Sequence, residues 1–570
     1  MLLLSQLRLE CGHAPGALER KLRRTLRLAK SDPLSFRIHR HSLDCRKKPL
    51  IFDVYSVVLS LSSAQEKRLL DRKLPGLREY HEKPYSPPVP GQEPLPERPV
   101  VVGFGPAGIF AGLILAQHGY QPLILERGKS MEERCRDVER FWKTGELDPG
   151  SNIQFGEGGA GTFSDGKLNT LVNDRDGRED FILRAFAEAG APGDILFESK
   201  PHIGTDILRD VIRTLRGRII RLGGEIRFGA AVTALEEKNG CLSGVVVNGS
   251  ERIPASAVIL APGHSARDTF EELLREGITM QAKDFAVGFR VAHPQRLIDA
   301  DQYGTADPEA LRAKRLPPSS YKLTERLRSG RGIYSFCMCP GGYVVNASSE
   351  PGLLAVNGMS YHGRDSGRAN SAIVMTVSAA DYGEDSPLAG MAFQRKLERA
   401  CHELGGGRIP AERFSDFARH TPSPEPLPEE LCIKGAFCAA PLDRLLPEPL
   451  TEDFLEGMRA FDRRMPGFAG KDAFVIGLES RTSSPVRIPR GETMEASLRG
   501  LYPCGEGAGY AGGIMSAAMD GMRIAEAVIR KYAPPQTLFH GGIYEPEIAF
   551  PSRRKPRVPQ RIKAAEKNCR

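Results

Sequence analysis

The sequence lacks several features that would place the protein in a membrane, outside the cell or around a metal. It has no apolar run of the roughly 18 residues that a membrane-spanning helix requires. Its start, MLLLSQLRLECGH, lacks the basic region of a signal peptide. Its 11 cysteines include no C-x-x-C pair and no cluster with metal-ligand spacing. We therefore expect a cytoplasmic protein without a membrane segment, a disulfide framework or a metal site.

Aromatic residues are also scarce, at 7% of the chain with one tryptophan. The net charge of +8 is concentrated at the two ends: residues 1–60 hold 12 Lys and Arg against 5 Asp and Glu, and residues 551–570 hold 8 against 1. Because single-stranded nucleic acids bind through aromatic stacking as well as positive charge, nucleic acid is not favoured as a partner. A chain of this length should contain about two to four domains.

A dinucleotide-binding motif occupies residues 99–127, with the sequence PVVVGFGPAGIFAGLILAQHGYQPLILER. An apolar run precedes glycines in G-x-G-x-x-G spacing, a helix is predicted over 107–118, and a second apolar run ends at Glu126. The glycines are Gly103, Gly105 and Gly108. In order, they allow a tight turn, close approach of a pyrophosphate, and helix–strand packing. The helix N-terminus favours phosphate, and Glu126 can accept ribose hydroxyls. The motif alone does not separate FAD from NAD.

Other segments are predicted to return the chain to the same ligand. Residues 152–170, NIQFGEGGAGTFSDGKLNT, contain five glycines within eleven residues. This pattern is typical of a loop pressed against a flat ligand, with a flexible surface loop as the alternative. A buried strand ends in Ala261-Pro262-Gly263, and a strand at 501–503 leads through a glycine turn into a helix over 514–531.

Several segments resemble the uncharacterised bacterial FAD-dependent dehydrogenases (NAD(P)/FAD-dependent oxidoreductases) of the glutathione-reductase-like flavoprotein superfamily, which carry a small N-terminal ferredoxin-like domain. The segments are VVGFGPAGIFAG, FGEGGAGTFSDGKL, VILAPGHSARD, SFCMCPGG, ESRTSSPVRI and LYPCGEGAGYAGGIMSAAMDGMRIAEA. The resemblance covers nearly the whole chain and implies FAD as the cofactor. A second nucleotide motif is absent, so NAD(P)H as a transient reductant, the substrate itself and a redox protein all remain open as electron sources.

The resemblance also implies which residues hold FAD. They are Gly103, Gly105, Pro106, Ala107, Gly108, Glu126, Arg127, Gly158, Gly159, Gly161, Thr162, Asp165, Gly166, Lys167, Ala261, Gly263, Gly505, Glu506, Gly512, Gly513 and Ile514. Glu506 stands where the superfamily places Asp, which is a departure in side-chain length.

The expected fold class is α/β: a Rossmann-type FAD-binding domain, an inserted β-rich substrate or cap domain, and a small N-terminal α+β unit of ferredoxin-like type. The expected boundaries are 1–80 for the N-terminal unit, 81–98 for a proline-rich linker, 99–279 and 471–533 for the two parts of the FAD-binding domain, 280–470 for the cap, and 534–570 for a basic tail.

Polar residues of the cap and of the return segment are the candidates for the substrate site. They are Arg290, Tyr361, His362, Arg364, Asn370, Glu479, Arg481 and Thr482. Arginines suit a carboxylate or phosphate substrate, and Tyr361 or His362 could transfer a proton. For each of them, a surface or core role is an equal alternative.

The pair Cys337 and Cys339 is not favoured as a redox pair. A C-x-C disulfide closes a tight, strained ring, unlike the C-x-x-C of disulfide oxidoreductases. We expect both cysteines to face one side of a strand as small core residues.

The leading hypothesis is an FAD-dependent oxidoreductase, a dehydrogenase or reductase, that transfers hydride between flavin and a small-molecule substrate. One alternative is an electron-transfer flavoprotein that docks a redox partner through its N-terminal domain. A less favoured alternative is an FAD-dependent RNA-modifying protein.

Overall fold

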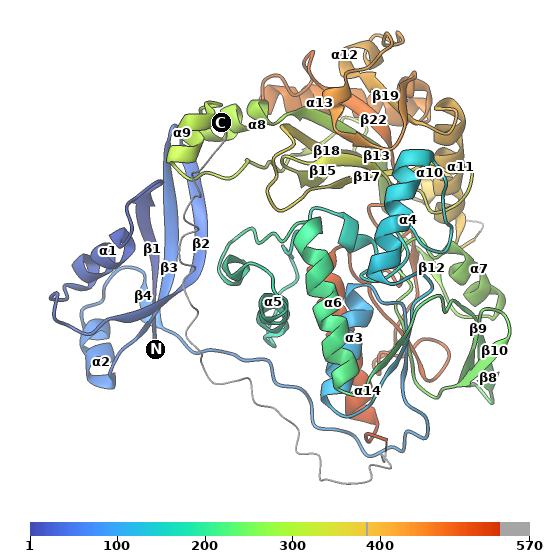
Figure 1. Cartoon of the computed structure of the whole chain (residues 1–570), viewed down its shortest axis with the longest axis horizontal. Coiled ribbons are helices and arrows are strands. Elements are labelled where there is room, and N and C mark those ends of the chain that lie inside the picture. Colours follow the sequence, from blue (N-terminus) through green and yellow to red (C-terminus); the bar gives the residue numbers. More distant parts are fainter. Residues whose placement is uncertain (384–385, 536–570) are drawn as a thin grey trace, which may run out of the picture.

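The computed structural model describes residues 1–383 and 386–535, and it consists of a small N-terminal unit beside a larger body (Figure 1). The expected basic tail therefore lies, apart from residues 534–535, outside the described residues. Within the described part of the chain, no helix combines the length and apolarity needed to cross a bilayer.

A five-stranded parallel sheet forms the centre of the lower body, in the order β24-β11-β5-β6-β7. Its strands are β5 (Val100–Val102), β6 (Leu123–Leu125), β7 (Glu225–Arg227), β11 (Val258–Leu260) and β24 (Leu501–Pro503). The helices beside it are α3 (Pro106–Gln117), α6 (Thr205–Arg221) and α14 (Ile514–Lys531). Helix α3 is apolar on every side and buried throughout Ala107–Ala116, since α6 and α14 pack against it. The strand–turn–helix–strand unit predicted over 99–127 is confirmed.

A seven-stranded sheet lies above the parallel sheet in Figure 1, in the order β14-β15-β18-β13-β22-β19-β21. Its strands are β13 (Phe285–Pro294), β14 (Thr324–Arg326), β15 (Gly332–Cys339), β18 (Arg368–Val377), β19 (Ile409–Arg413), β21 (Phe437–Ala439) and β22 (Phe474–Glu479). All of them fall between β11 and β24, so the chain leaves the parallel sheet and later returns to it. Strand β22 pairs with β13 and β19, whereas the sequence assigned residues from 471 onward to the nucleotide domain.

Smaller elements complete the body. The additional strands are β8 (Val232–Lys238), β9 (Cys241–Val247), β10 (Glu251–Pro254), β12 (Gln281–Ala282), β16 (Tyr343–Asn346), β17 (Val356–Met359), β20 (Ile433–Lys434) and β23 (Val486–Arg487). The additional helices are α4 (Met131–Thr144), α5 (Arg178–Glu188), α7 (Arg267–Arg275), α8 (Gln295–Tyr303), α9 (Pro308–Ala313), α10 (Ala379–Tyr382), α11 (Ala389–Leu404), α12 (Phe414–Phe417) and α13 (Glu448–Arg464).

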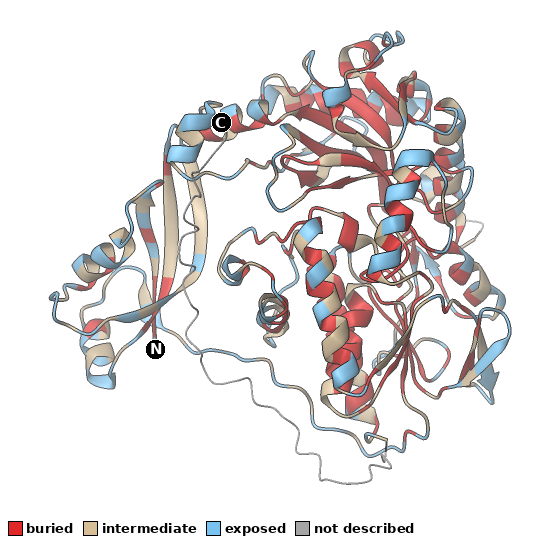
Figure 2. Ribbon diagram, in the orientation of Figure 1, coloured by how far each residue is buried: buried red, intermediate tan, exposed pale blue. Residues whose placement is uncertain are grey.

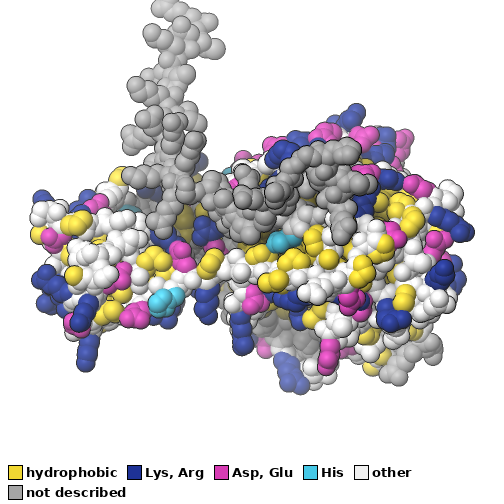
Figure 3. Space-filling view, turned by 90° about the horizontal axis from the view of Figure 1, so that it is seen from below, with side chains coloured by type: hydrophobic (Ala, Val, Ile, Leu, Met, Phe, Trp, Pro, Cys, Tyr) yellow, Lys and Arg dark blue, Asp and Glu magenta, His cyan; other side chains and the backbone are white. Residues whose placement is uncertain are grey.

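The N-terminal unit is a four-stranded antiparallel sheet in the order β2-β3-β1-β4 with two helices. Its elements are β1 (Leu2–Glu10), α1 (Ala17–Leu26), β2 (Ser35–Lys47), β3 (Leu50–Ser60), α2 (Ser63–Asp71) and β4 (Leu77–Glu79). It has its own small apolar core around Leu22 and Leu26, and Figure 2 shows that most buried residues lie in the body instead. On the face seen in Figure 3, its Lys and Arg side chains are interspersed with Asp and Glu. Residues 81–98 join it to the body without helix or strand.

Candidate functional site

A cavity of about 350 Å³ lies where the carboxyl ends of β5, β6, β11 and β24 meet residues of the seven-stranded sheet. The first turns of α3 and α14 form part of its wall, through Pro106 and Ala107 and through Ile514 and Ala517. The carboxyl edge of an open parallel sheet is the usual place for a ligand in α/β folds. This cavity is therefore the candidate functional site.

The three glycines of the first turn have different surroundings. Gly103 has φ of 97°, and a Cβ there would lie 2.3 Å from the carbonyl oxygen of Ala261. Gly105 lines the cavity, and the nearest atom to a Cβ there would be 3.7 Å away. Gly108 does not line the cavity, because its Cα faces the turn: a Cβ would lie 1.9 Å from the Gly103 carbonyl oxygen. Only the first two therefore stand beside ligand space.

Glu126 follows β6, is buried, and lines the cavity. Its carboxylate accepts hydrogen bonds from the backbone N–H of Phe104 at 2.7 Å and from those of Gly128 and Gly156 at 2.9 Å. It thus ties the first turn, the strand end and the glycine-rich loop together. A carboxylate offers about four acceptor positions, so one remains for a ligand hydroxyl.

The glycine-rich loop is held by Arg134 of α4, which sequence reasoning did not identify. This fully buried guanidinium donates to the backbone carbonyls of Asn152, Ile153, Gly156, Glu157 and Gly159 at 2.6–3.3 Å. Burial lowers the pKa of Arg134 to about 10. The loop is thus a clamped part of the wall, and the alternative of a flexible surface loop is wrong.

The chain returns to the cavity through the turn after β24 and the start of α14. Gly505 donates its backbone N–H to the Asp520 carboxylate at 2.8 Å, and Arg490 pairs with the same carboxylate at 3.0 Å. The first turn of α14 has no side-chain cap, and a Cβ at Gly512 or Gly513 would meet nothing within 4 Å. This helix end therefore presents free N–H groups beside open space.

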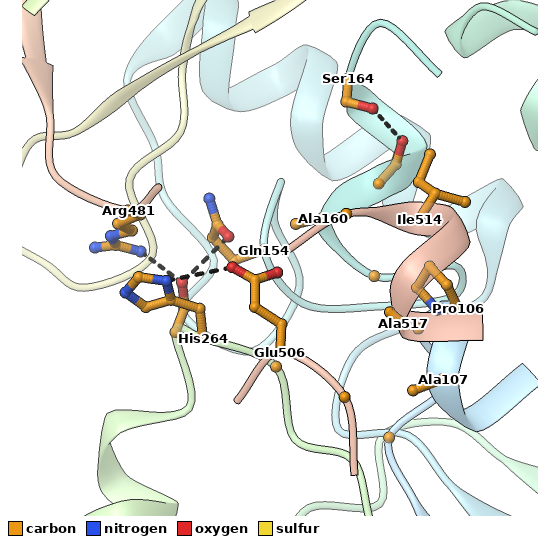
Figure 4. Close-up of a pocket in the computed structure, with 18 of the residues that line it drawn as sticks. Pro106, Ala107, Gln154, Ala160, Ser164, His264, Arg481, Glu506, Ile514 and Ala517 are labelled. Carbon is orange, nitrogen blue, oxygen red and sulfur yellow. Dashed lines mark hydrogen bonds and ion pairs between the residues drawn. The ribbon is translucent and has the colours of Figure 1, made fainter. Parts of the chain in front are cut away.

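A charged network lies in the middle of the cavity wall (Figure 4). His264 pairs with Glu506 at 3.4 Å, and Arg481 donates to Ser265 at 3.0 Å. Arg481 also pairs with the fully buried Glu398 at 2.7 Å. Burial would raise the pKa of the Glu398 carboxyl, but the charges of Arg481 and Arg267 outweigh burial and hold that pKa below its usual range.

The remaining part of the wall carries two carboxylates that are each paired with an arginine behind them. Asp165 accepts from Arg364 at 2.6 Å, and Glu479 accepts from the fully buried Arg290 at 2.9 Å. Burial raises the pKa of Glu479, with Arg290 opposing it. Burial would also raise the pKa of Asp165, but the charges of Lys167 and Arg364 lower it overall.

The structure brings most of the predicted residues together. Those that line the cavity are Gly103, Gly105, Pro106, Ala107, Glu126, Arg127, Gly159, Gly161, Asp165, Gly166, Lys167, Ala261, Gly263, Glu479, Arg481, Thr482, Gly505, Glu506, Gly512, Gly513 and Ile514. Those that do not are Gly108, Gly158, Thr162, Arg290, Tyr361, His362, Arg364 and Asn370.

The misplaced predictions have physical reasons. Arg290 and Arg364 form ion pairs behind the wall, with Glu479 and Asp165 respectively. The Asn370 side-chain oxygen accepts a hydrogen bond from Arg290 at 2.9 Å. Tyr361 packs against Tyr343 in a separate aromatic cluster under α4.

Three further residues are displaced by packing rather than by charge. The His362 ring bonds the Ile203 carbonyl at 2.9 Å. Gly158 and Thr162 face each other within the loop, where a Cβ on the glycine would lie 2.2 Å from the threonine hydroxyl oxygen.

Sequence reasoning missed several wall residues. Gln154, His264 and Asn357 line the cavity, as does Cys337, which we expected in the core. Gln154 lies in the glycine-rich segment 152–170, and His264 directly follows Gly263. Their positions beside glycines predicted to contact the ligand could have identified them. Nothing in the local pattern marks Asn357 or Cys337.

Comparisons with known proteins bear on this site. Residues 284–482 match the family model "FAD-dependent protein, C-terminal domain-like", and residues 1–60 match a domain of unknown function, DUF8436. A Clostridium beijerinckii protein described as uncharacterized is 45% identical over 538 residues, covering 91% of this chain and 97% of that protein.

Solved structures give weaker matches. The glycerol-3-phosphate dehydrogenase of Bacillus halodurans complexed with FAD is 12% identical with a TM-score of 0.35, covering 77% of this chain and 65% of that chain. A geranylgeranyl bacteriochlorophyll reductase-like protein of Thermoplasma acidophilum is 13% identical with a TM-score of 0.32, covering 76% and 78%. Likeness at this level does not define a reaction.

Proposed function

We propose that this chain, which belongs to the same family as the Clostridium beijerinckii protein, is an FAD-dependent oxidoreductase whose cofactor lies in the cavity. The observation that carries the proposal is the meeting of two uncapped helix N-termini, a strand-end carboxylate and open backbone glycines at one cavity. The family model matched by residues 284–482 supports FAD as the cofactor.

The wall residues fit a dinucleotide. Gly105 and Gly505 stand beside the first turn of α3, whose N–H groups and dipole favour a pyrophosphate. Glu126 keeps one acceptor position for a ribose hydroxyl. Residues 161–167 and 512–514 would then flank the flavin ring.

Bound FAD would supply two-electron chemistry, and the chain would supply orientation, shielding and charge. The N-terminus of α14 would stabilise negative charge on the reduced ring. Lys167, at the end of the loop that flanks the flavin, would face a small-molecule substrate together with Glu479 and Thr482. NAD(P)H is the candidate electron donor, and a redox protein is the alternative.

The layout of the chain supports assigning a role to each part. We interpret the parallel sheet as a Rossmann-type FAD-binding domain and the seven-stranded sheet as the cap over its ligand. The N-terminal unit has the strand order of the split βαβ, or ferredoxin-like, fold. In the alternative with a redox protein as electron donor, we assign the docking of that protein to this unit. The ten described cysteines are all free, which favours a reducing compartment such as the cytoplasm.

The test is a visible absorption spectrum of the purified chain, repeated anaerobically with NADH and with NADPH. A flavin band that one nicotinamide bleaches rapidly would establish a reductase. A band that neither bleaches would direct the search to a substrate or protein donor. Protein that contains no flavin and takes up no added FAD would refute the proposal.

A further inference from the structure

A lysine of the small sheet β17-β16-β20 is enclosed by three aromatic rings, which we call the aromatic cage. The half-buried Lys434, on β20, has its ammonium 4.6 Å from the ring centroid of Tyr343 and 5.5 Å from those of Trp142 and Tyr361. These separations are within the roughly 6 Å over which an aromatic face attracts a cation. Among the described residues, Lys434 forms no ion pair. The rings are therefore the partners of its charge.

The aromatic cage joins helix α4 to the small sheet. Trp142 is on α4, Tyr343 is on β16, and Tyr361 follows β17. The Trp142 indole N–H also donates to the backbone carbonyl oxygen of Asn346, the last residue of β16, at 3.2 Å. The indole is therefore held by the small sheet through both a hydrogen bond and the caged lysine. This arrangement also gives a role to Tyr361, which the sequence had suggested for the substrate site.

Trp142 also contacts the glycine-rich loop of the cavity wall. Its ring meets that of Phe163 at 89° with centroids 6.2 Å apart, which is a favourable edge-to-face arrangement. Phe163 is fully buried, and the guanidinium groups of Arg134 and Arg209 each lie 4.9 Å from its ring centroid. Residues 159–161, just before Phe163, line the cavity. A continuous line of contacts thus runs from the caged lysine through two rings to the backbone assigned to FAD.

We propose that Lys434 is a positioning residue for the cofactor: its charge holds Trp142, and Trp142 holds Phe163 and the loop in the arrangement that accepts FAD. The small sheet and the loop are thereby coupled, so that a displacement of this sheet changes the affinity for FAD. This inference rests on the proposed function, which assigns FAD to the cavity. It adds a means by which the cap regulates that site.

The coupling acts on the part of the loop that Arg134 does not hold. The Arg134 hydrogen bonds end at Gly159, so residues 160–163 depend on the Phe163 contacts and on the Thr205 hydroxyl, which donates to the Thr162 carbonyl at 2.8 Å. When the indole leaves the cage, Phe163 loses its edge contact and the loop samples arrangements that do not accept FAD. The apparent affinity then falls by the fraction of competent molecules, which a half-buried cation–aromatic contact can change about fivefold.

The experiment uses the fact that Trp142 is the only tryptophan of the chain, so that tryptophan fluorescence reports on the cage alone. The full-length apoprotein is titrated with FAD while Trp142 emission and the absorption of bound flavin are measured. Because flavin absorbs where tryptophan emits, bound FAD should quench this emission. Lys434→Met keeps the length of the side chain and removes its charge, whereas Lys434→Arg keeps a cation. The matched control is Lys238→Met, at an exposed lysine of β8 outside the cage.

We expect Lys434→Met to bind FAD about fivefold more weakly and to shift the Trp142 emission to longer wavelength, because the indole becomes more exposed to water. Lys434→Arg should bind FAD like the unmodified chain, because a guanidinium also stacks on aromatic faces. Lys238→Met should be unchanged. Phe163→Leu removes the ring through which Lys434 acts. Adding Lys434→Met to it should cause no further loss of affinity, because changes along one line of contacts are not additive.

Unchanged FAD affinity in Lys434→Met would overturn the inference, as would an equal loss in Lys434→Arg or additive losses in the double variant. The unmodified chain provides a test that does not depend on the folding of any variant. Once FAD is bound, acrylamide should quench the remaining Trp142 emission with a lower bimolecular rate constant, and an unchanged constant would overturn the coupling. An unmodified chain that takes up no FAD refutes the proposed function together with this inference. FAD binding that is insensitive to Lys434 refutes the inference alone.

Discussion

Alanine substitutions at two glycines of the first turn should separate cofactor binding from folding. Gly105 has φ of −78° and ψ of −175°, which any residue can adopt, and the nearest atom to an added Cβ would be 3.7 Å away. At Gly108, the added Cβ would lie 1.9 Å from the backbone oxygen of Gly103. The methyl group of Gly105→Ala would therefore project into the cavity, whereas the methyl group of Gly108→Ala would collide with the backbone of the turn.

The magnitudes follow from these contacts. Gly105→Ala should leave the apoprotein as stable or more stable by about 0.4–1 kcal/mol, because alanine restricts the unfolded chain. Its FAD affinity should fall about tenfold, or about 1.4 kcal/mol, because the methyl lies where a pyrophosphate must approach. Gly108→Ala should lower the free energy of unfolding by about 3 kcal/mol, because backbone must move to relieve the collision.

The assays are urea unfolding of the apoprotein and titration with FAD. Gly193→Ala is the matched control: this glycine lies outside the cavity wall, and an added Cβ would meet nothing within 4 Å. FAD affinity should be unchanged in this control, and stability should be equal or higher by about 0.4–1 kcal/mol, as for Gly105→Ala. Wild-type FAD affinity in Gly105→Ala would refute the placement of the pyrophosphate. Wild-type stability in Gly108→Ala would refute the packing argument.

Three further predictions concern charges. His41 links the N-terminal unit to Glu198 of the body at 2.6 Å, and its partners raise its pKa to about 9 against the effect of burial. This stabilisation is present below the unfolded pKa of about 6.5 and is lost as pH rises through 9. The melting-temperature difference between the wild type and His41→Gln should therefore shrink from pH 6.5 to 9, and a constant difference would contradict it. Arg134→Met should reduce the free energy of unfolding in urea by about 3 kcal/mol or more, since buried carbonyls lose their donor; a smaller loss would show that water replaces the guanidinium. Glu479→Ala should cost about 3–5 kcal/mol in the same assay, because it leaves Arg290 buried and unpaired, and Glu479→Asp should recover part of the loss.

Local elements of the fold could be predicted from the sequence. A helix was predicted over 514–531, and α14 has these bounds in the structure. The prediction follows from short-range periodicity and from the glycines that precede the helix. The glycine spacing of the first turn likewise placed α3 and its two flanking strands, because every contact that defines this unit lies within about thirty residues.

The substrate side of the cavity could not be predicted in the same way. Arg290 is surrounded by apolar strand residues, and its partner Glu479 is 189 residues away in the chain. No local pattern shows that the guanidinium will be neutralised behind the wall. Cys337 faces the cavity because β15 gains one residue against β18, and register is set by pairing rather than by local sequence.

The pairing of charges around the cavity also changes which substrates the site favours. Arginines were expected to bind a carboxylate or phosphate substrate. In the structure, each of the three arginines forms an ion pair with a carboxylate of the protein: Arg290 with Glu479, Arg364 with Asp165, and Arg481 with Glu398. A buried arginine already paired with a carboxylate offers little net attraction to an anion. Among the described residues on this part of the wall, the Lys167 ammonium has no hydrogen-bond partner, and it lies 3.4 Å from the Asp165 carboxylate. A substrate there would therefore meet Lys167 as the available cation, because the charges of the three arginines are already paired.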